Sequence, residues 1–279
     1  MDLEETETQF MNEKTEFFWL NFINKMLCNK AVIGKSVSPQ NILSLINKLH
    51  PRVFEKGLIR LGAKGDGGYL VPDDLNEIEA CFSPGVSNVS EFELDCIKRG
   101  MKVFMADKSV DAPNLNIPKN GYSFLKKFIG TINNEDYITM NKWVESSDLS
   151  GKSDLLLQMD IEGCEYTSLL NTSDYVMKRF RIIVIEFHYL KDLWNQRFFN
   201  LVENTIDYML QTHTCVHIHP NNYFGTYKRK GIEIPATAEF TFARNDRAIS
   251  KEFQHTFPHP SDSDNLNRKT VVLPRQWYG

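Results

Sequence analysis

Apolar residues along the chain follow two kinds of spacing. Continuous apolar runs, typical of strands buried on both faces of a sheet, occur at 154–159 and 181–185. Apolar residues three and four positions apart, typical of amphipathic helices, occur at 10–27, 39–49 and 193–211. Strand and helix patterns alternate through the middle of the chain, which predicts an α/β fold with an open sheet.

The segment from Asp154 to Tyr166 joins a buried strand to a cluster of acids. Its apolar run ends in Asp160, Glu162 and Glu165 around a glycine. Ligands of open α/β sheets bind at the carboxyl ends of the strands. The run at 181–185 also ends in polar residues, Glu186 and His188. If the two strands are neighbours, Asp160, Glu186 and His188 point into one cleft, whereas Glu165 starts the next helix.

A strand-turn-helix-strand unit is predicted from Ile78 to Asp107. The first strand enters Ser83-Pro84-Gly85, and Ser90 with Glu93 has the spacing of a capping box at the start of the helix. A glycine turn lets the backbone approach a ligand, and an acid ending the next strand can accept both ribose hydroxyls. The unit therefore predicts an adenosine ligand. It lacks GxGxxG, which argues against a dinucleotide.

The remaining segments flank this unit. Residues 1–57 are predicted to form an N-terminal helical extension, with Ser38 and Pro39 beginning the second helix. A Gly-Asp-Gly-Gly turn between apolar runs predicts a β-hairpin at 58–72, which is either an ordinary hairpin or a flap over a ligand. The main domain covers 58–244, and the polar segment 245–279 is predicted to be a loosely ordered tail wrapping the domain.

Composition narrows the class of protein. The chain has 279 residues, is 42% hydrophobic and carries a net charge of −4, which fits one large domain and argues against nucleic-acid binding. Its five cysteines are scattered and odd in number, as expected of free thiols in the cytoplasm. No apolar run approaches the roughly 18 residues of a membrane span, and acids rather than a basic segment follow Met1, so neither a span nor a signal peptide is predicted.

With these motifs, the chain resembles the FkbM-like S-adenosylmethionine (SAM)-dependent methyltransferases, many of which O-methylate sugars. The segment Met159 to Tyr166 is similar to the family's D-x-E-G-x-E element. The similarity extends to 138–145, to the strand ending at Ile185–His188 and to the unit 78–107, spanning roughly 58–244. It implies a Rossmann-like, class I methyltransferase sheet of seven strands with the last one antiparallel. It also implies methyl transfer to a sugar hydroxyl of a nucleotide-sugar or a surface glycan, such as capsule or lipopolysaccharide.

The resemblance also implies which residues bind SAM. Phe82 to Ser87 is the SAM-binding turn, Asp107 is the ribose acid and the region around Gly130 lies near adenine. The expected SAM contacts are Ser83, Pro84, Gly85, Ser87, Asp107, Lys108, Gly130, Thr131, Asp160 and Glu162. The turn departs from the family pattern, since the usual acid and Gly-Ala-Asn are replaced by Phe82-Ser83-Pro84-Gly85-Val86-Ser87.

Methylation of a sugar hydroxyl needs a base or a metal ion, because the hydroxyl is weakly acidic. The expected catalytic residues are Asp160, His188 and His219. Mg²⁺ or Mn²⁺ bound by Asp160, Glu186 and His219 is one hypothesis. The other is that the two acids only bind local backbone and orient a histidine, with His188 as the base.

Residues suited to the acceptor lie in the hairpin and after the strand at 214–219. They are Lys64, Asp66, Tyr69, Asn221, Asn222 and Tyr223. Lys228-Arg229-Lys230 is either a solvated loop or a grip for a diphosphate. Two further readings are a non-catalytic glycan-binding module of the same fold and a methyltransferase for a non-sugar acceptor. A homodimer is compatible with each.

Overall fold

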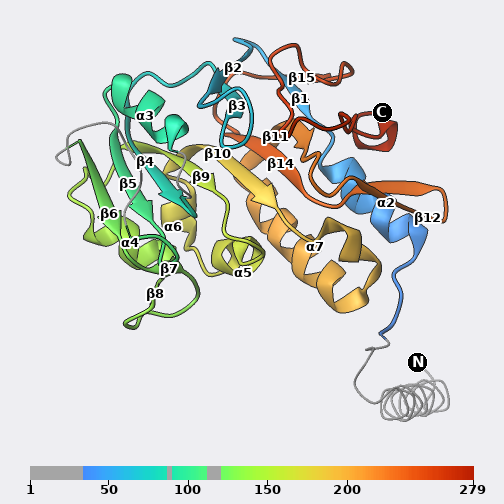
Figure 1. Ribbon diagram of the computed structural model, residues 1–279, viewed down its shortest axis with the longest axis horizontal. Coiled ribbons are helices and arrows are strands. Elements are labelled where there is room, and N and C mark those ends of the chain that lie inside the picture. Colours follow the sequence, from blue (N-terminus) through green and yellow to red (C-terminus); the bar gives the residue numbers. More distant parts are fainter. Residues whose placement is uncertain (1–33, 87–89, 112–120) are drawn as a thin grey trace.

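The computed structural model describes residues 34–86, 90–111 and 121–279 (Figure 1). The predicted helix at 10–27 and the predicted SAM contact at Ser87 lie outside the described residues. Helix α2 (Pro39–Lys48) begins as predicted, because the hydroxyl of Ser38 accepts a hydrogen bond from the Asn41 N–H at 3.1 Å and Pro39 occupies the first turn.

A seven-stranded sheet runs through the molecule in the order β11-β14-β10-β9-β4-β5-β6. All neighbouring pairs are parallel except those that β14, the last of the seven along the chain, makes with β10 and β11. The predicted α/β fold and the antiparallel last strand are therefore confirmed, and the sheet is compatible with a Rossmann-like fold. The strands are β4 (Ile78–Pro84), β5 (Lys102–Ala106), β6 (Tyr122–Leu125), β9 (Asp154–Met159), β10 (Phe180–Phe187), β11 (His213–Pro220) and β14 (Ala238–Arg244).

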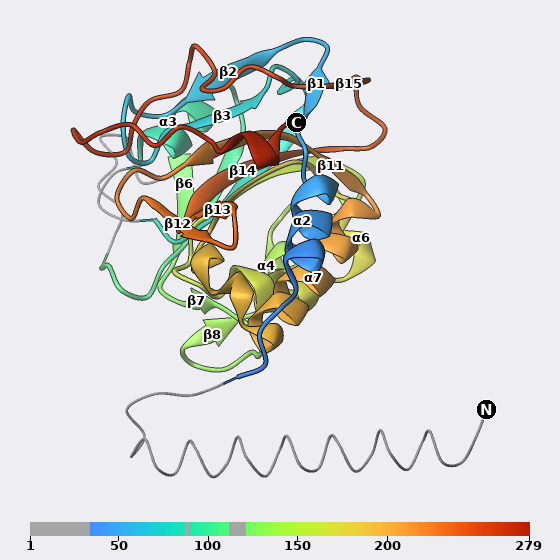
Figure 2. The ribbon, with the colours of Figure 1, turned by 90° about the vertical axis from the view of Figure 1, so that its right-hand side faces the viewer.

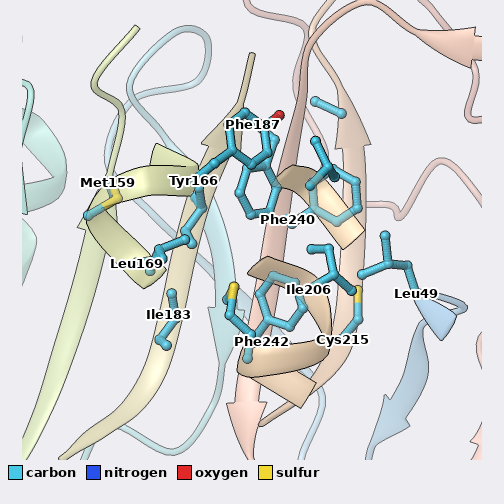
Figure 3. Close-up of a cluster of buried hydrophobic side chains, with 14 of the residues drawn as sticks. Leu49, Met159, Tyr166, Leu169, Ile183, Phe187, Ile206, Cys215, Phe240 and Phe242 are labelled. Carbon is cyan, nitrogen blue, oxygen red and sulfur yellow. The ribbon is translucent and has the colours of Figure 1, made fainter. Parts of the chain in front are cut away.

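Helices cover one face of the sheet, and a helix with a hairpin covers part of the other (Figures 1 and 2). The first face carries α2, α4 (Met140–Ser146), α5 (Glu165–Leu170), α6 (Asp174–Met177) and α7 (Gln196–Leu210). The second face carries α3 (Glu91–Lys98) and the predicted hairpin, β2 (Leu58–Leu61) paired with β3 (Tyr69–Pro72). Figure 3 shows aromatic and aliphatic side chains of the strands meeting α5 and α7 in the larger core.

Short elements complete the fold. They are β1 (Arg52–Phe54) with β15 (Ile249–Phe253), β7 (Phe128–Ile129) with β8 (Tyr137–Ile138), β12 (Thr226–Arg229) with β13 (Ile232–Pro235), and the 3₁₀ helices η2 (Leu190–Trp194) and η3 (Arg275–Trp277). Lys228-Arg229-Lys230 thus belongs to the β12–β13 hairpin rather than to a plain loop. In the part of the chain that the structure describes, no helix is both long and apolar enough to cross a membrane.

The predicted capping box of α3 does not form. Ser90 stands at the N-cap position, but its side chain caps nothing there, and Glu93 turns inward to hydrogen-bond with Ser83. Burial raises the pKa of the Glu93 carboxyl. The box fails because Glu93 finds a buried partner on the neighbouring strand.

The tail from residue 245 is more firmly packed than the predicted loose wrap. Trp277 is 1% exposed, belongs to the larger core beside Phe240, and donates its indole N–H to the Glu233 carbonyl at 3.1 Å. Residues 52–54 of the predicted helical extension pair with 249–253 of the tail. The segment before residue 58 therefore pairs with the segment after residue 244, and both pack against the domain.

We expect Trp277→Ala to lower the free energy of unfolding by about 3–5 kcal/mol, because it empties a core position and removes a hydrogen bond. Urea unfolding followed by circular dichroism measures this loss. Val272→Ala is the matched control, since Val272 lies in the same tail and is 52% exposed. Equal stability of the two variants would contradict a packed tail.

Candidate functional site

A cavity of about 460 Å³ opens at the carboxyl ends of β4, β5 and β9. This is the size of a small-molecule site, at the edge of the sheet where open α/β folds bind ligands. Its lining includes Gly85, Asp107, Phe128, Tyr137, Asp160 and Glu162. The two strand-end acids that the sequence predicts, Asp107 and Asp160, thus line the same cavity.

Gly85 lets the end of β4 lie directly against the end of β9. Its φ is 85°, and a Cβ atom there would lie 1.5 Å from the carbonyl oxygen of Asp160. The Asp160 N–H donates to the Pro84 carbonyl at 3.2 Å, and the Gly85 N–H donates to the Ala106 carbonyl at 3.0 Å. Only glycine fits this crossing, and its bare backbone forms one wall of the cavity.

Asp107 is presented by the end of β5. Its Oδ1 accepts hydrogen bonds from the Ser109 N–H at 2.7 Å and the Ser109 hydroxyl at 2.6 Å. Both bonds use Oδ1, and they fix the carboxylate beside the cavity. The carboxylate is therefore placed to accept hydrogen bonds from a ligand.

Two half-exposed aromatic rings also line the cavity. Phe128 and Tyr137 lie on the paired strands β7 and β8 with ring centroids 5.7 Å apart. Gly130 lies against Tyr137, where a Cβ atom would come within 2.9 Å of the ring. A planar apolar ligand could stack here, at the region that the resemblance assigns to adenine.

Other predicted SAM contacts lie at the margin of the cavity or away from it. The Ser83 side chain is buried between Glu93 and Gln158, with its hydroxyl 2.6 Å from Oε1 of Gln158, so it faces the interior. Lys108 pairs with Asp136. Pro84, Lys108, Gly130 and Thr131 do not line the cavity, whereas Gly85, Asp107, Asp160 and Glu162 do.

A buried carboxylate, Glu165, joins the ends of β9 and β10. Glu165 is 0% exposed and begins α5 as predicted. Its Oε1 accepts the N–H groups of Ile161 at 3.1 Å and Gly163 at 3.0 Å, and lies 3.0 Å from Nδ1 of His188. An ionised carboxylate only accepts, so Nδ1 carries the shared hydrogen and Nε2 remains to exchange a proton with a ligand.

Nε2 of His188 faces two further acids. It lies 3.8 Å from Oδ1 of Asp160 and 3.5 Å from Oε2 of the exposed Glu162. Burial alone would lower the pKa of His188, but the hydrogen bond and charge of Glu165, with the nearby Glu186 and Asp160, raise it to about 9. Burial and then the charge of Glu186 raise the pKa of Asp160 to about 8.

Ligand atoms close enough together to hold a divalent cation lie beside His188. Among the described residues, Asp160, Glu165 and His188 offer ligand atoms that all lie within 4.8 Å of one another. Oδ1 of Asp160 is buried and accepts no hydrogen bond within the described part of the chain, and carboxylate oxygens with one imidazole suit Mg²⁺ or Mn²⁺. The structure thus groups Asp160 with Glu165 and His188. It places His219 on β11, three strands from β9, so the predicted set of Asp160, Glu186 and His219 does not surround one ion.

Four ionisable residues form a row across neighbouring strands, here called the cross-strand row: Asp160, Glu186, Glu239 and His219. Asp160 directly follows Met159, which pairs with Ile185, so Glu186 lies next to it. Glu186 pairs with Glu239, and Glu239 pairs with His219. Paired residues share a face of the sheet, so the row runs from the cavity toward β11 under the β2–β3 hairpin.

Amide side chains bind the two glutamates of the row. Asn221 donates its Nδ2–H to Oε1 of Glu186 at 2.7 Å, and Asn265 of the tail donates to Oε1 of Glu239 at 3.0 Å. Burial raises the pKa of Glu186 and that of Glu239 to about 7, and the charge of Glu239 adds to the shift of Glu186. Asn221 is thus hydrogen-bonded to the cross-strand row.

The other predicted acceptor residues are divided. Tyr69 is buried on β3, which packs against β10 and β14, and burial with the charges of Asp160 and Glu186 raises its pKa well above the ordinary value. Asp66 is exposed at the hairpin tip, 3.3 Å from Nδ2 of Asn265, and Lys64 is exposed nearby. Asn222 instead holds the tail through the Leu266 backbone, and Tyr223 is exposed beneath the Arg268 guanidinium.

Several site residues are not among those that the sequence predicts: Glu165 as a partner of His188, Glu239, Asp262 and Asn265. Asp262 lies 2.8 Å from Nε2 of His217 and 3.5 Å from Nδ1 of His219, so His217 is an interior histidine with an acidic partner. The tail residues carry no periodic signal. For Glu165 the one sequence signal is its place as the last acid of the D-x-E-G-x-E element.

Comparisons with known proteins add little. No protein-family model matches the chain, and no curated protein matches it. Among solved structures the chain is similar to one described as the crystal structure of Thermoplasma acidophilum 1320, with 13% identity over 61% of this chain and 80% of that chain and a TM-score of 0.32.

Proposed function

We propose that the protein is a SAM-dependent O-methyltransferase that acts on a sugar hydroxyl of a nucleotide-sugar or surface glycan. One observation carries the proposal: Gly85, Asp107 and two aromatic rings line the same cavity as Asp160, and His188 lies beside Asp160. A nucleoside-sized cavity next to a candidate proton acceptor is what methyl transfer to a hydroxyl requires.

The cavity's parts suit the parts of SAM. The Asp107 carboxylate is placed for ribose hydroxyls, the rings of Phe128 and Tyr137 for adenine, and the bare backbone at Gly85 for close approach of the ligand. A sheet of seven strands with the last one antiparallel is compatible with the sheet that the FkbM-like resemblance implies.

The acceptor side is supplied by His188 and its neighbours. SAM brings an activated methyl group, and the protein must hold the acceptor oxygen in line and remove its proton. Glu165 fixes the His188 ring through Nδ1, so Nε2 faces the cavity edge as a base. The polar cross-strand row continues from this point and offers hydrogen-bonding partners to a polyhydroxyl acceptor.

A divalent ion is a second candidate for lowering the barrier. Asp160 and His188, with Glu165, could hold Mg²⁺ or Mn²⁺, which would stabilise a developing alkoxide. If the chain binds glycans without catalysis, titration calorimetry with SAM and S-adenosylhomocysteine would show no heat at high micromolar ligand. A panel of nucleotide-sugars and non-sugar acceptors, assayed with SAM, tests the acceptor class.

We expect Asp107→Ala to weaken binding of S-adenosylhomocysteine about 10- to 100-fold, because ribose hydroxyls lose a charged acceptor. Calorimetry measures the change. Asp111→Ala is the control, since Asp111 is exposed a few residues further along the same segment and lies outside the cavity lining. Unchanged affinity in Asp107→Ala would contradict the assignment of this cavity to SAM.

The pH dependence of turnover tests the base. His188 accepts a proton only when neutral, so turnover should rise with pH toward its pKa of about 9. Glu165→Gln removes the anion that favours the protonated ring, so the rising limb should move to lower pH by about one unit or more while kcat falls about 10-fold or more. The pH profile of Glu145→Gln, an exposed change on α4, should match the wild type. Superimposable profiles for wild type and Glu165→Gln would exclude His188 as the base.

Treatment with a chelator distinguishes a reaction that uses His188 as the base from one that uses a metal ion. With His188 as the base, turnover should survive EDTA within about twofold and gain little from Mn²⁺. Loss of turnover in EDTA that Mn²⁺ restores, together with Mn²⁺ binding that Asp160→Asn abolishes in calorimetry, would assign the chemistry to the ion instead.

A further inference from the structure

The cross-strand row is short of positive charge. Glu186, Glu239 and Asp160 lie in it. Asp262 of the tail lies 3.5 Å from Nδ1 of His219, and Asp66 of the hairpin lies 3.3 Å from Nδ2 of Asn265. The opposing cations are His188, His219 and Arg60, but Arg60 donates to the Ala63 and Gly65 carbonyls and so is held in the hairpin turn. Buried carboxylates need a cationic partner or must bind protons.

His219, at the end of the row, has unused hydrogen-bonding capacity. Its ring is 4% exposed, and neither nitrogen makes a hydrogen bond in the described part of the chain; the nearest acid oxygen, on Asp262, is 3.5 Å away. Oδ1 of the neighbouring Asn265 also accepts no hydrogen bond from any residue that the structure describes. Buried polar atoms in native proteins are normally satisfied, so these atoms point to a ligand with donors and acceptors on this face.

We propose that the cross-strand row recognises an ammonium group on the acceptor, which makes the acceptor an amino sugar or a similar amine-bearing polyol. This inference rests on the proposed function and names its substrate class. An ammonium group has three donors and no acceptor, which suits the carboxylates of Glu186 and Glu239 on adjacent strands. His219 and the Asn265 amide oxygen then remain for hydroxyl groups.

The spacing of the row favours an organic cation over a metal ion. Among the described residues, the set of ligand atoms close enough to surround one ion belongs to Asp160, Glu165 and His188 and includes neither Glu186 nor Glu239. Neighbouring strands lie about 4.8 Å apart, so Glu186 and Glu239 are roughly 5–10 Å along the row from Asp160. That distance corresponds to an amine about one sugar ring from the hydroxyl that is methylated.

The experiment compares matched amines and amides. Glucose carrying an amine at position 2, 3, 4 or 6 and the corresponding N-acetyl sugars are titrated into the wild-type protein with and without S-adenosylhomocysteine, and affinity is measured by NMR. We expect at least one amine to bind about tenfold or more tightly than its N-acetyl partner. Glu239→Gln and Glu186→Gln should each remove this preference, whereas Glu203→Gln, a surface change on α7, should keep it.

The outcomes separate the inference from the proposed function. If S-adenosylhomocysteine binds but every amine and N-acetyl pair has equal affinity, the ammonium site is wrong and the methyltransferase proposal stands. If the cofactor product fails to bind while the amine preference is present in the unliganded protein, the reverse holds. Mn²⁺ binding that Glu239→Gln abolishes would also overturn the inference, because it would make the row a metal site. Unchanged binding of S-adenosylhomocysteine and normal thermal unfolding of the variants exclude misfolding as the cause.

Discussion

The candidate site depends on one buried anion, the carboxylate of Glu165. Burying a charge is costly unless hydrogen bonds compensate it, and here two backbone N–H groups and the His188 ring do so. The same contacts fix the turn after β9 and hold His188 at the end of β10. Gly163 completes the turn with φ 102°, and a Cβ atom there would come within 2.4 Å of the Tyr189 ring. The ends of β9 and β10, where the candidate site residues lie, are thereby held in one arrangement.

Local pattern predicts much of this fold. Continuous apolar runs locate β9 and β10, and the acids that end them lie together because the strands are parallel neighbours. Helix α7 follows from its apolar spacing. The sequence locates both Gly85 and Asp107, because a tight turn and a strand-ending acid are local features. Both residues line the same cavity. The sequence therefore locates a candidate site residue when that residue lies in a strand or directly after it.

Residues whose role depends on distant partners are not predictable in this way. Helix-terminus electrostatics already accounts for Glu165, so nothing in the sequence calls for a histidine partner 23 positions away. The pairing of Glu239 with Glu186 depends on the register of an antiparallel strand. Asp262 and Asn265 belong to a polar tail without periodicity, and the capping box at Ser90 loses to a buried contact of Glu93.

The contact between Asp66 and Asn265 also bears on how the site assembles. The two residues are 199 positions apart, whereas the lining of the cavity at the ends of β4, β5 and β9 comes from residues 85–164. Closing a longer loop costs more chain entropy, and long-range contacts generally form late in folding. The hairpin and the tail should therefore dock after the sheet has formed and be among the first parts to open locally. A molecule in that partly opened state would keep the cavity and lose the polar site under the hairpin. Under the proposed function, cofactor binding and acceptor binding therefore need not share one thermal limit.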